Sequence, residues 1–298
     1  MGYNEMNTAK KGDRQLEFKG LMGGLYRLCE WIMRLSVVNV LWFVFSFPIF
    51  YLGLVGLVSA QSAGLKAMIP SFALAAVISP FLLFPATGAM FSVARKWVLG
   101  DEDVPLFKTF LRGYKENYLQ SMKGGLIFLL FGIVMYSNYW YYSQQSGSIQ
   151  WLAFLFAALS VFLFAALFHY FSIMVHFHMK FWQIVRNAIL ISFGYPLTSV
   201  ALVVVNFTIF FVSVSLYQFV FLILFFAGSV VAVFSFWNFR RIFARLQAKR
   251  EALMAKQSGE QQTDEGASEE NPPGGEAERN EDSAAHDSTD LGKHKDKL

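Results

Sequence analysis

Six long apolar stretches, separated by polar segments, dominate the pattern of hydrophobic and polar positions along the chain. An α-helix needs about 20 mostly apolar residues to cross a bilayer, and each stretch is of that order of length. We therefore predict an all-α fold, a polytopic membrane bundle of about six transmembrane helices. The predicted spans cover residues 36–58, 70–94, 124–142, 151–177, 187–213 and 217–238.

The composition favours a membrane domain over a soluble one. Hydrophobic residues make up 55% of the 298 residues and charged residues only 15%, whereas globular proteins average about 25% charged residues. No Asp or Glu occurs between Glu116 and Glu251. A soluble domain of that length would need acidic surface residues, whereas a membrane domain avoids them because charges in lipid are costly.

Lys and Arg are concentrated in alternate loops, and this predicts the orientation of the spans. The loop after the first span contains only Lys66, and the loops after the third and fifth spans contain no Lys or Arg. The segment before the first span, the loops after the second and fourth, and the segment after the sixth are basic. Because cytoplasmic loops carry the excess of Lys and Arg, we expect a multi-pass protein with both termini in the cytoplasm.

The chain divides into four predicted parts. Residues 1–20 form a polar N-terminal segment, residues 21–245 the six-span membrane domain, and residues 246–256 the end of a charged helix. Residues 257–298 contain twelve acidic and four basic residues and almost no large apolar ones. Such a segment cannot bury enough surface to offset its ordering entropy, so we predict a disordered acidic tail.

Two amphipathic stretches predict helices that lie in the membrane interface on the cytoplasmic side. One covers residues 20–35 and the other residues 104–121, which Asp103 could cap. In the second, the apolar stripe has helical spacing and the cationic side chains lie off it; the stripe is Phe107, Phe110, Leu111, Tyr114 and Tyr118. These helices either anchor the bundle or offer a docking surface for a cytoplasmic partner, whose candidate residues are Arg95, Lys96, Tyr114, Lys115 and Asn117.

A pair of prolines marks the second span. Pro80 and Pro85 lie inside its apolar run, and each removes a backbone donor from the helix. The sequence therefore predicts a broken helix. The break is either a hinge or cavity lining, with Pro85 and Thr87 as candidate residues, or an ordinary packing kink.

Polar residues within the spans are few. His169 is the one ionisable side chain deep in a predicted span, and such residues often mark ion or substrate pathways. It is either a proton or substrate ligand or a neutral imidazole that hydrogen-bonds between helices. Four asparagines are predicted to hydrogen-bond between helices: Asn39, Asn138, Asn206 and Asn238.

Motifs for known chemistries are missing from the sequence. It contains no phosphate-binding G-x-x-x-x-G-K-[ST] loop, no H-E-x-x-H and no G-x-S-x-G. His176 and His178 have no acidic or cysteine companion nearby, which argues against a metal site. We therefore expect neither an enzyme nor a cofactor, and no nucleic-acid partner.

Five short motifs stand out along the chain: "NVLW" (Asn39–Trp42), "FSFPIF" (Phe45–Phe50), "PATGAM" (Pro85–Met90), "RKWVLGDED" and "FLRGYKENYLQS". Together they resemble the YesL family of bacterial integral membrane proteins, a domain of unknown function. The resemblance covers roughly residues 20–245. The acidic tail, and extra sequence between the "FP" of the first span (Phe47-Pro48) and "PAT" (Pro85–Thr87), depart from the shorter members.

This resemblance implies a location in the bacterial cytoplasmic membrane and a non-enzymatic accessory or scaffold role linked to carbohydrate uptake. The implied partners are the lipid bilayer and subunits of an ABC-type sugar transporter. The alternative that the residues leave open is a small-molecule transporter or channel that acts by facilitated diffusion.

Overall fold

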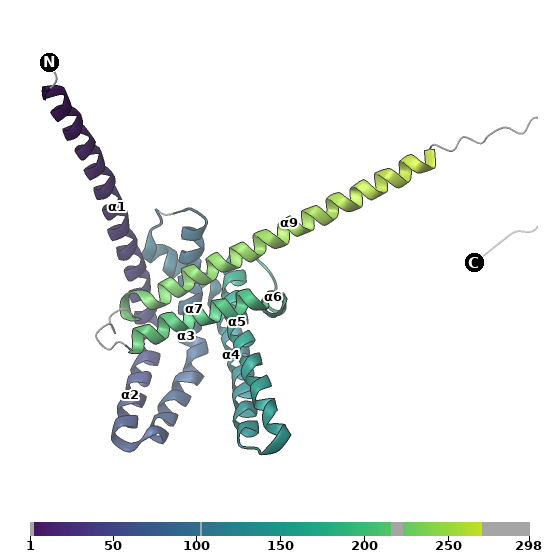
Figure 1. Ribbon diagram of the computed structural model, residues 1–298. Helices are drawn as coiled ribbons and strands as arrows, with labels where there is room; N and C mark the ends of the chain where they lie inside the picture. The colour runs from purple at the N-terminus through teal and green to yellow at the C-terminus, as the bar shows by residue number, and fades with distance from the viewer. Residues whose placement is uncertain (1–2, 102, 216–222, 270–298) are drawn as a thin grey trace, which may run out of the picture. The chain divides into compact units, whose positions relative to one another are not determined.

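The computed structural model describes residues 3–101, 103–215 and 223–269, and within these ranges the chain forms helices and no strand (Figure 1). The predicted all-α class is therefore confirmed. The chain forms two compact units, Met1–Leu246 and Gln247–Leu298. The apolar helices belong to the first unit.

The described helices run in the following order. They are α1 (Tyr3–Phe45), α2 (Phe47–Ala63), the 3-10 turn η1 (Leu65–Met68), α3 (Ile69–Val98), α4 (Leu106–Ser143), the 3-10 turn η2 (Gly147–Gln150), α5 (Trp151–His176), α6 (Phe181–Gly194), α7 (Pro196–Ser215), the π-helical turn η4 (Ile223–Ala227) and α9 (Gly228–Glu269). In Figure 1 the α2–α3 hairpin and the α4–α5 hairpin extend toward the same side of the first unit, at the bottom of the view.

The described residues contain four helices long and apolar enough to cross a membrane, or five if one bent pair counts as a span. The four are Gly23–Phe45, Leu65–Val98, Leu106–Ser143 and Gly147–His176. The sequence predicted six. The first predicted span is divided at Ser46, where α1 ends and α2 begins with Pro48 in its first turn, a position that suits proline.

The fifth and sixth predicted spans also differ from expectation. The fifth bends by 99° between Gly194 and Pro196, where α6 gives way to α7. Of the sixth, residues 217–222 lie outside the described residues, and the remainder forms η4 and the start of α9. The helix α9 continues to Glu269, beyond the start of the predicted acidic tail at residue 257. Residues 270–298 lie outside the described part.

The predicted break in the second span is wrong, because α3 runs uninterrupted from Ile69 to Val98 through Pro80 and Pro85. Pro80 cannot donate to the carbonyl four residues earlier. That carbonyl, of Ala76, instead accepts a hydrogen bond from the Ser79 hydroxyl at 2.8 Å. Such replacement of a lost bond lets a membrane helix tolerate proline.

The predicted interfacial helices are not separate elements. Residues 20–35 belong to α1, and residues 106–121 are the first half of α4, which continues to Ser143. The glycines at the expected junction, Gly124 and Gly125, stay helical because α5 and α3 pack directly against them, with Tyr170 and Phe84 respectively as the nearest side chains. Asp103 does not cap α4, whose N-cap is Pro105.

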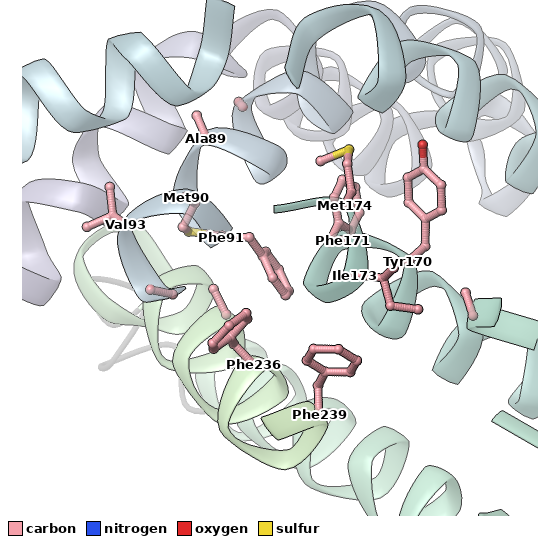
Figure 2. Close-up of a cluster of buried hydrophobic side chains, with 14 of the residues drawn as sticks. Ala89, Met90, Phe91, Val93, Tyr170, Phe171, Ile173, Met174, Phe236 and Phe239 are labelled. Carbon is pink, nitrogen blue, oxygen red and sulfur yellow. The ribbon is translucent and has the colours of Figure 1, made fainter. Parts of the chain in front are cut away.

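The core of the first unit lies where α3, α5 and the start of α9 meet (Figure 2). Phe91 from α3 and Phe171 from α5 have ring centroids 5.4 Å apart, and Phe236 and Phe239 of α9 pack beside them. All four side chains are buried. Since aromatic rings of this size bury the most apolar surface, these contacts fix the ends of α3 and α5 relative to each other.

Candidate functional site

A basic groove lies between the end of α3, the first half of α4 and the end of α5. Its volume is about 820 Å³. Its lysine, arginine and amide side chains are Arg95, Lys96, Lys108, Arg112, Asn117 and Gln120, and Glu116 and His178 also line it. We call this cavity the basic groove.

The cations of the groove come from two helix ends. Arg95 and Lys96 lie in the last turn of α3, where positive side chains interact favourably with the helix dipole. Lys108 and Arg112 lie four residues apart near the start of α4, and this spacing places both on one helix face. Because the short loop from Leu99 to Pro105 joins these ends, the four cations face a common space.

The floor of the groove is set by a close approach of α3 and α4. A Cβ at Gly113 would lie 2.7 Å from Cβ of Ser92, so only glycine permits this distance. Asn117 donates hydrogen bonds to Ser92 Oγ at 3.1 Å and to the Gly113 carbonyl at 3.0 Å. These two bonds fix the orientation of the Asn117 amide beside the groove.

The charges of the groove are only partly neutralised. Arg112 Nε donates to Glu116 Oε1 at 2.8 Å, and both side chains are exposed. No ion pair to Arg95, Lys96 or Lys108 occurs within the described ranges. The buried Nε of Arg95 has no hydrogen-bond partner there either. A buried donor without a partner carries a desolvation cost.

The structure brings three of the predicted docking residues together and leaves two apart. Arg95, Lys96 and Asn117 line the basic groove. Tyr114 instead packs against Phe45, with ring centroids 4.9 Å apart. Lys115 is exposed and does not line the groove. Lys108, Arg112 and Gln120 were not among the predicted residues. The four-residue spacing of the first two could have identified them.

The other predicted candidates lie deeper in the bundle and do not share one site. Pro85 is buried. The Thr87 hydroxyl accepts a hydrogen bond from Trp42 Nε1 at 3.0 Å and donates to the Leu83 carbonyl at 2.7 Å. His169 is fully buried, and neither of its ring nitrogens has a hydrogen-bond partner in the described part of the chain.

A second pocket, of about 370 Å³, touches Thr87 and is lined almost entirely by apolar side chains, among them Trp42 and Phe50. Neither Pro85 nor His169 lines it. The hydrogen bonds predicted for His169 between helices are absent from the described residues.

Two of the four asparagines join helices as predicted. Asn39 Nδ2 donates to the Leu224 carbonyl at 2.7 Å, and its Oδ1 accepts from the Ser229 backbone N–H at 2.9 Å. Asn206 donates to Ser235 Oγ at 3.1 Å. The prediction is wrong for Asn138, which donates to the Val134 carbonyl of its own helix at 2.7 Å.

The "NVLW" and "PATGAM" motifs therefore have structural roles. Asn39 hydrogen-bonds α1 to η4 and α9, and Trp42 hydrogen-bonds α1 to Thr87 of α3. Each motif therefore supplies a side chain that hydrogen-bonds between helices.

Comparisons with known proteins agree with these motifs. Residues 35–139, from α1 to near the end of α4, match the family model described as "Protein of unknown function, DUF624". The matched region contains the six lysine, arginine and amide residues of the basic groove. Comparison with the solved structures gives no match.

Three uncharacterized proteins of Bacillus subtilis (strain 168) are similar to the chain. YteU is 30% identical over 195 residues, which cover 64% of this chain and 75% of YteU. YesL is 28% identical over 241 residues, which cover 80% of this chain and all of YesL. YesV is 30% identical over 181 residues, which cover 59% of this chain and 71% of YesV. The extent of these matches, together with the family match over α1 to α4, places the chain in the YesL-like DUF624 family of proteins of unknown function.

Proposed function

We propose that this protein is a non-enzymatic accessory or scaffold protein of the bacterial cytoplasmic membrane, with both termini in the cytoplasm, that assembles with a carbohydrate-uptake system. The observation that carries the proposal is the close packing of the interior. A Cβ would lie within 3 Å of atoms from a neighbouring helix at each of four glycines on α3 and α4: Gly88, Gly113, Gly124 and Gly125. Small residues that bring helices this close are typical of rigid membrane bundles.

The orientation is supported by the charges at the two ends of the hairpins. The turn between α2 and α3 carries Lys66 alone, and the turn from Gln144 to Gln150 carries no charge. The opposite ends of these helices carry the cations of the basic groove. By the positive-inside rule, these charges support a cytoplasmic position for the groove.

Labelling with a membrane-impermeant thiol reagent tests this orientation. The one native cysteine, Cys29, is first replaced by serine, and single cysteines are then introduced at Ser146 and, separately, at Lys115. In intact cells we expect labelling at position 146 and protection at position 115. The reverse pattern would contradict the orientation.

Close packing favours a scaffold over a conducting pathway. The pocket beside Thr87 is apolar and does not include His169 or Pro85, so it is a poor match to a hydrated sugar. The alternative, facilitated diffusion of a small molecule, needs a polar passage. Liposomes that contain the purified protein test it directly, and we expect no uptake of radiolabelled sugars above that of empty liposomes.

The proposed partners are the subunits of an ABC-type sugar transporter, which would meet the exposed basic side of α4. The tagged protein is purified from native membranes in a mild detergent, and its companions are identified by mass spectrometry. We expect transporter subunits to co-purify, and charge reversal at the exposed Lys115 (Lys115→Glu) to reduce their yield. Repeated recovery of the protein alone would refute the scaffold proposal.

A further inference from the structure

The basic groove has an excess of positive charge that the described residues do not balance. Arg95, Lys96 and Lys108 carry no ion pair within those residues, and Glu116 pairs with Arg112 alone. Clustered cations repel one another, and this repulsion raises the free energy of the folded state. An anion in the groove would relieve this repulsion.

The geometry favours a compact, multiply charged anion over a single carboxylate. The guanidinium of Arg95 offers donors in a planar fork, and its Nε is buried without a partner among the described residues. Lys96 and Lys108 add point charges from two different helices. A phosphate group, with several acceptor oxygens, can accept from all three at once.

The start of α4 adds to the same preference. Its N-cap is Pro105, no side chain caps the helix, and Pro105, Lys108 and Thr109 all line the groove. The free backbone N–H groups of a helix N-terminus favour negative charge.

The volume leaves room for more than the phosphate itself. At about 820 Å³ the groove falls within the range of roughly 300–1,000 Å³ found for small-molecule sites. Asn117 and Gln120 also line the groove, and amides of this kind hydrogen-bond hydroxyl groups.

We propose that the basic groove binds a phosphate group carried by a hydroxylated molecule, either a soluble phosphate ester or the headgroup of an anionic lipid, through Arg95, Lys96 and Lys108. The site is independent of the accessory role and of any protein partner. Arg95 grips the phosphate, the two lysines neutralise it, and Asn117 and Gln120 contact the attached hydroxyl groups.

Thermal unfolding of the full chain tests the site and distinguishes the two sources. In detergent, inorganic phosphate is added against chloride at equal ionic strength. In lipid nanodiscs, phosphatidylglycerol is compared with phosphatidylcholine. We expect at least one of these anions to raise the unfolding temperature in a saturable manner. A response to inorganic phosphate identifies a soluble ester as the ligand class, and a response to phosphatidylglycerol alone identifies a lipid headgroup.

Matched lysine variants locate the response. Lys108→Gln and Lys96→Gln each remove one cation from the groove, whereas Lys115→Gln removes an exposed lysine of α4 outside it. We expect each groove variant to weaken binding by roughly tenfold, the effect of losing one charge-assisted hydrogen bond, and Lys115→Gln to bind as the wild type does. The absence of any response to either anion, or an equal loss in all three variants, would overturn the proposal.

Discussion

The ring of Tyr170 fills the space into which a side chain at Gly124 would project. A Cβ at Gly124 would lie 2.5 Å from Cε1 and from Cζ of the ring. The ring cannot easily move, because Tyr170 is fully buried and its hydroxyl donates to the Gln120 carbonyl at 2.6 Å. This contact joins α4 to α5.

Replacing Gly124 by alanine should therefore destabilise the protein. We expect Gly124→Ala to lower the free energy of unfolding by about 1–3 kcal/mol, the usual cost of overpacking a close contact. Denaturant or thermal unfolding of the purified protein in detergent measures the change.

Gly132 provides the matched control, since it lies on the same helix and a Cβ there would meet no neighbouring atom within 4 Å. Gly132→Ala should leave stability unchanged or raise it by up to about 1 kcal/mol, because alanine is the better helix former. Equal free energies of unfolding for the two variants would contradict the close contact between Gly124 and Tyr170.

The second, third and fourth spans could be predicted from the sequence, because lipid requires long apolar helices and a run of apolar residues is a local feature of the chain. The continuity of α4 could not. Lys123, Gly124 and Gly125 end the amphipathic pattern and suggest a boundary, and what holds them helical is packing against Tyr170 and Phe84. No local signal reveals a partner that lies so far along the chain.

The basic groove could likewise be predicted only in part from the sequence. The cationic ends of α3 and α4 are visible in the sequence, and Arg95, Lys96 and Asn117 were among the predicted residues. The contribution of α5, through Met174 and Val175, depends on tertiary packing. The partner of Asp103 was missed for the same reason: a cap is a local feature, whereas Arg34 is 69 residues earlier in the chain.

Asn39 should contribute substantially to stability, because its side chain bonds backbone groups of two other elements. Asn39→Leu removes the acceptor for the Ser229 N–H and the donor to the Leu224 carbonyl, and it leaves both backbone groups without this partner. We expect the free energy of unfolding to fall by about 1–3 kcal/mol. Asn138→Leu is the control, since Asn138 bonds only its own helix at Val134 in the described structure, and it should change stability little. Equal effects at the two sites would contradict the role of Asn39.

Removing Arg34 from its ion pair with Asp103 should cost much more stability than removing Asp103. The two groups are 2.7 Å apart, but the Asp103 side chain is 96% exposed whereas that of Arg34 is 10% exposed and also contacts Glu30. An exposed carboxylate gains little from pairing in water, so Asp103→Asn should leave the unfolding temperature nearly unchanged.

Arg34→Gln should lower the free energy of unfolding by roughly 1–3 kcal/mol, since it removes hydrogen bonds between charged groups from a mostly buried site. Unfolding of both variants and of the double variant measures the coupling. A loss at Asp103 as large as that at Arg34 would show that the pair is stronger than its exposure indicates.

The stability of His169 variants tests most directly whether this residue has a role in transport. It is fully buried, and neither ring nitrogen has a hydrogen-bond partner within the described residues. A buried polar group without a partner destabilises the fold. We therefore expect His169→Leu to keep the wild-type stability or to raise the free energy of unfolding by about 1–2 kcal/mol. His169→Asn, which keeps a polar group but loses volume, should be less stable than His169→Leu, and unfolding in detergent compares the two. A large loss of stability in His169→Leu, together with wild-type stability in His169→Asn, would show that the imidazole has a polar partner and would restore His169 as a candidate for proton or substrate binding.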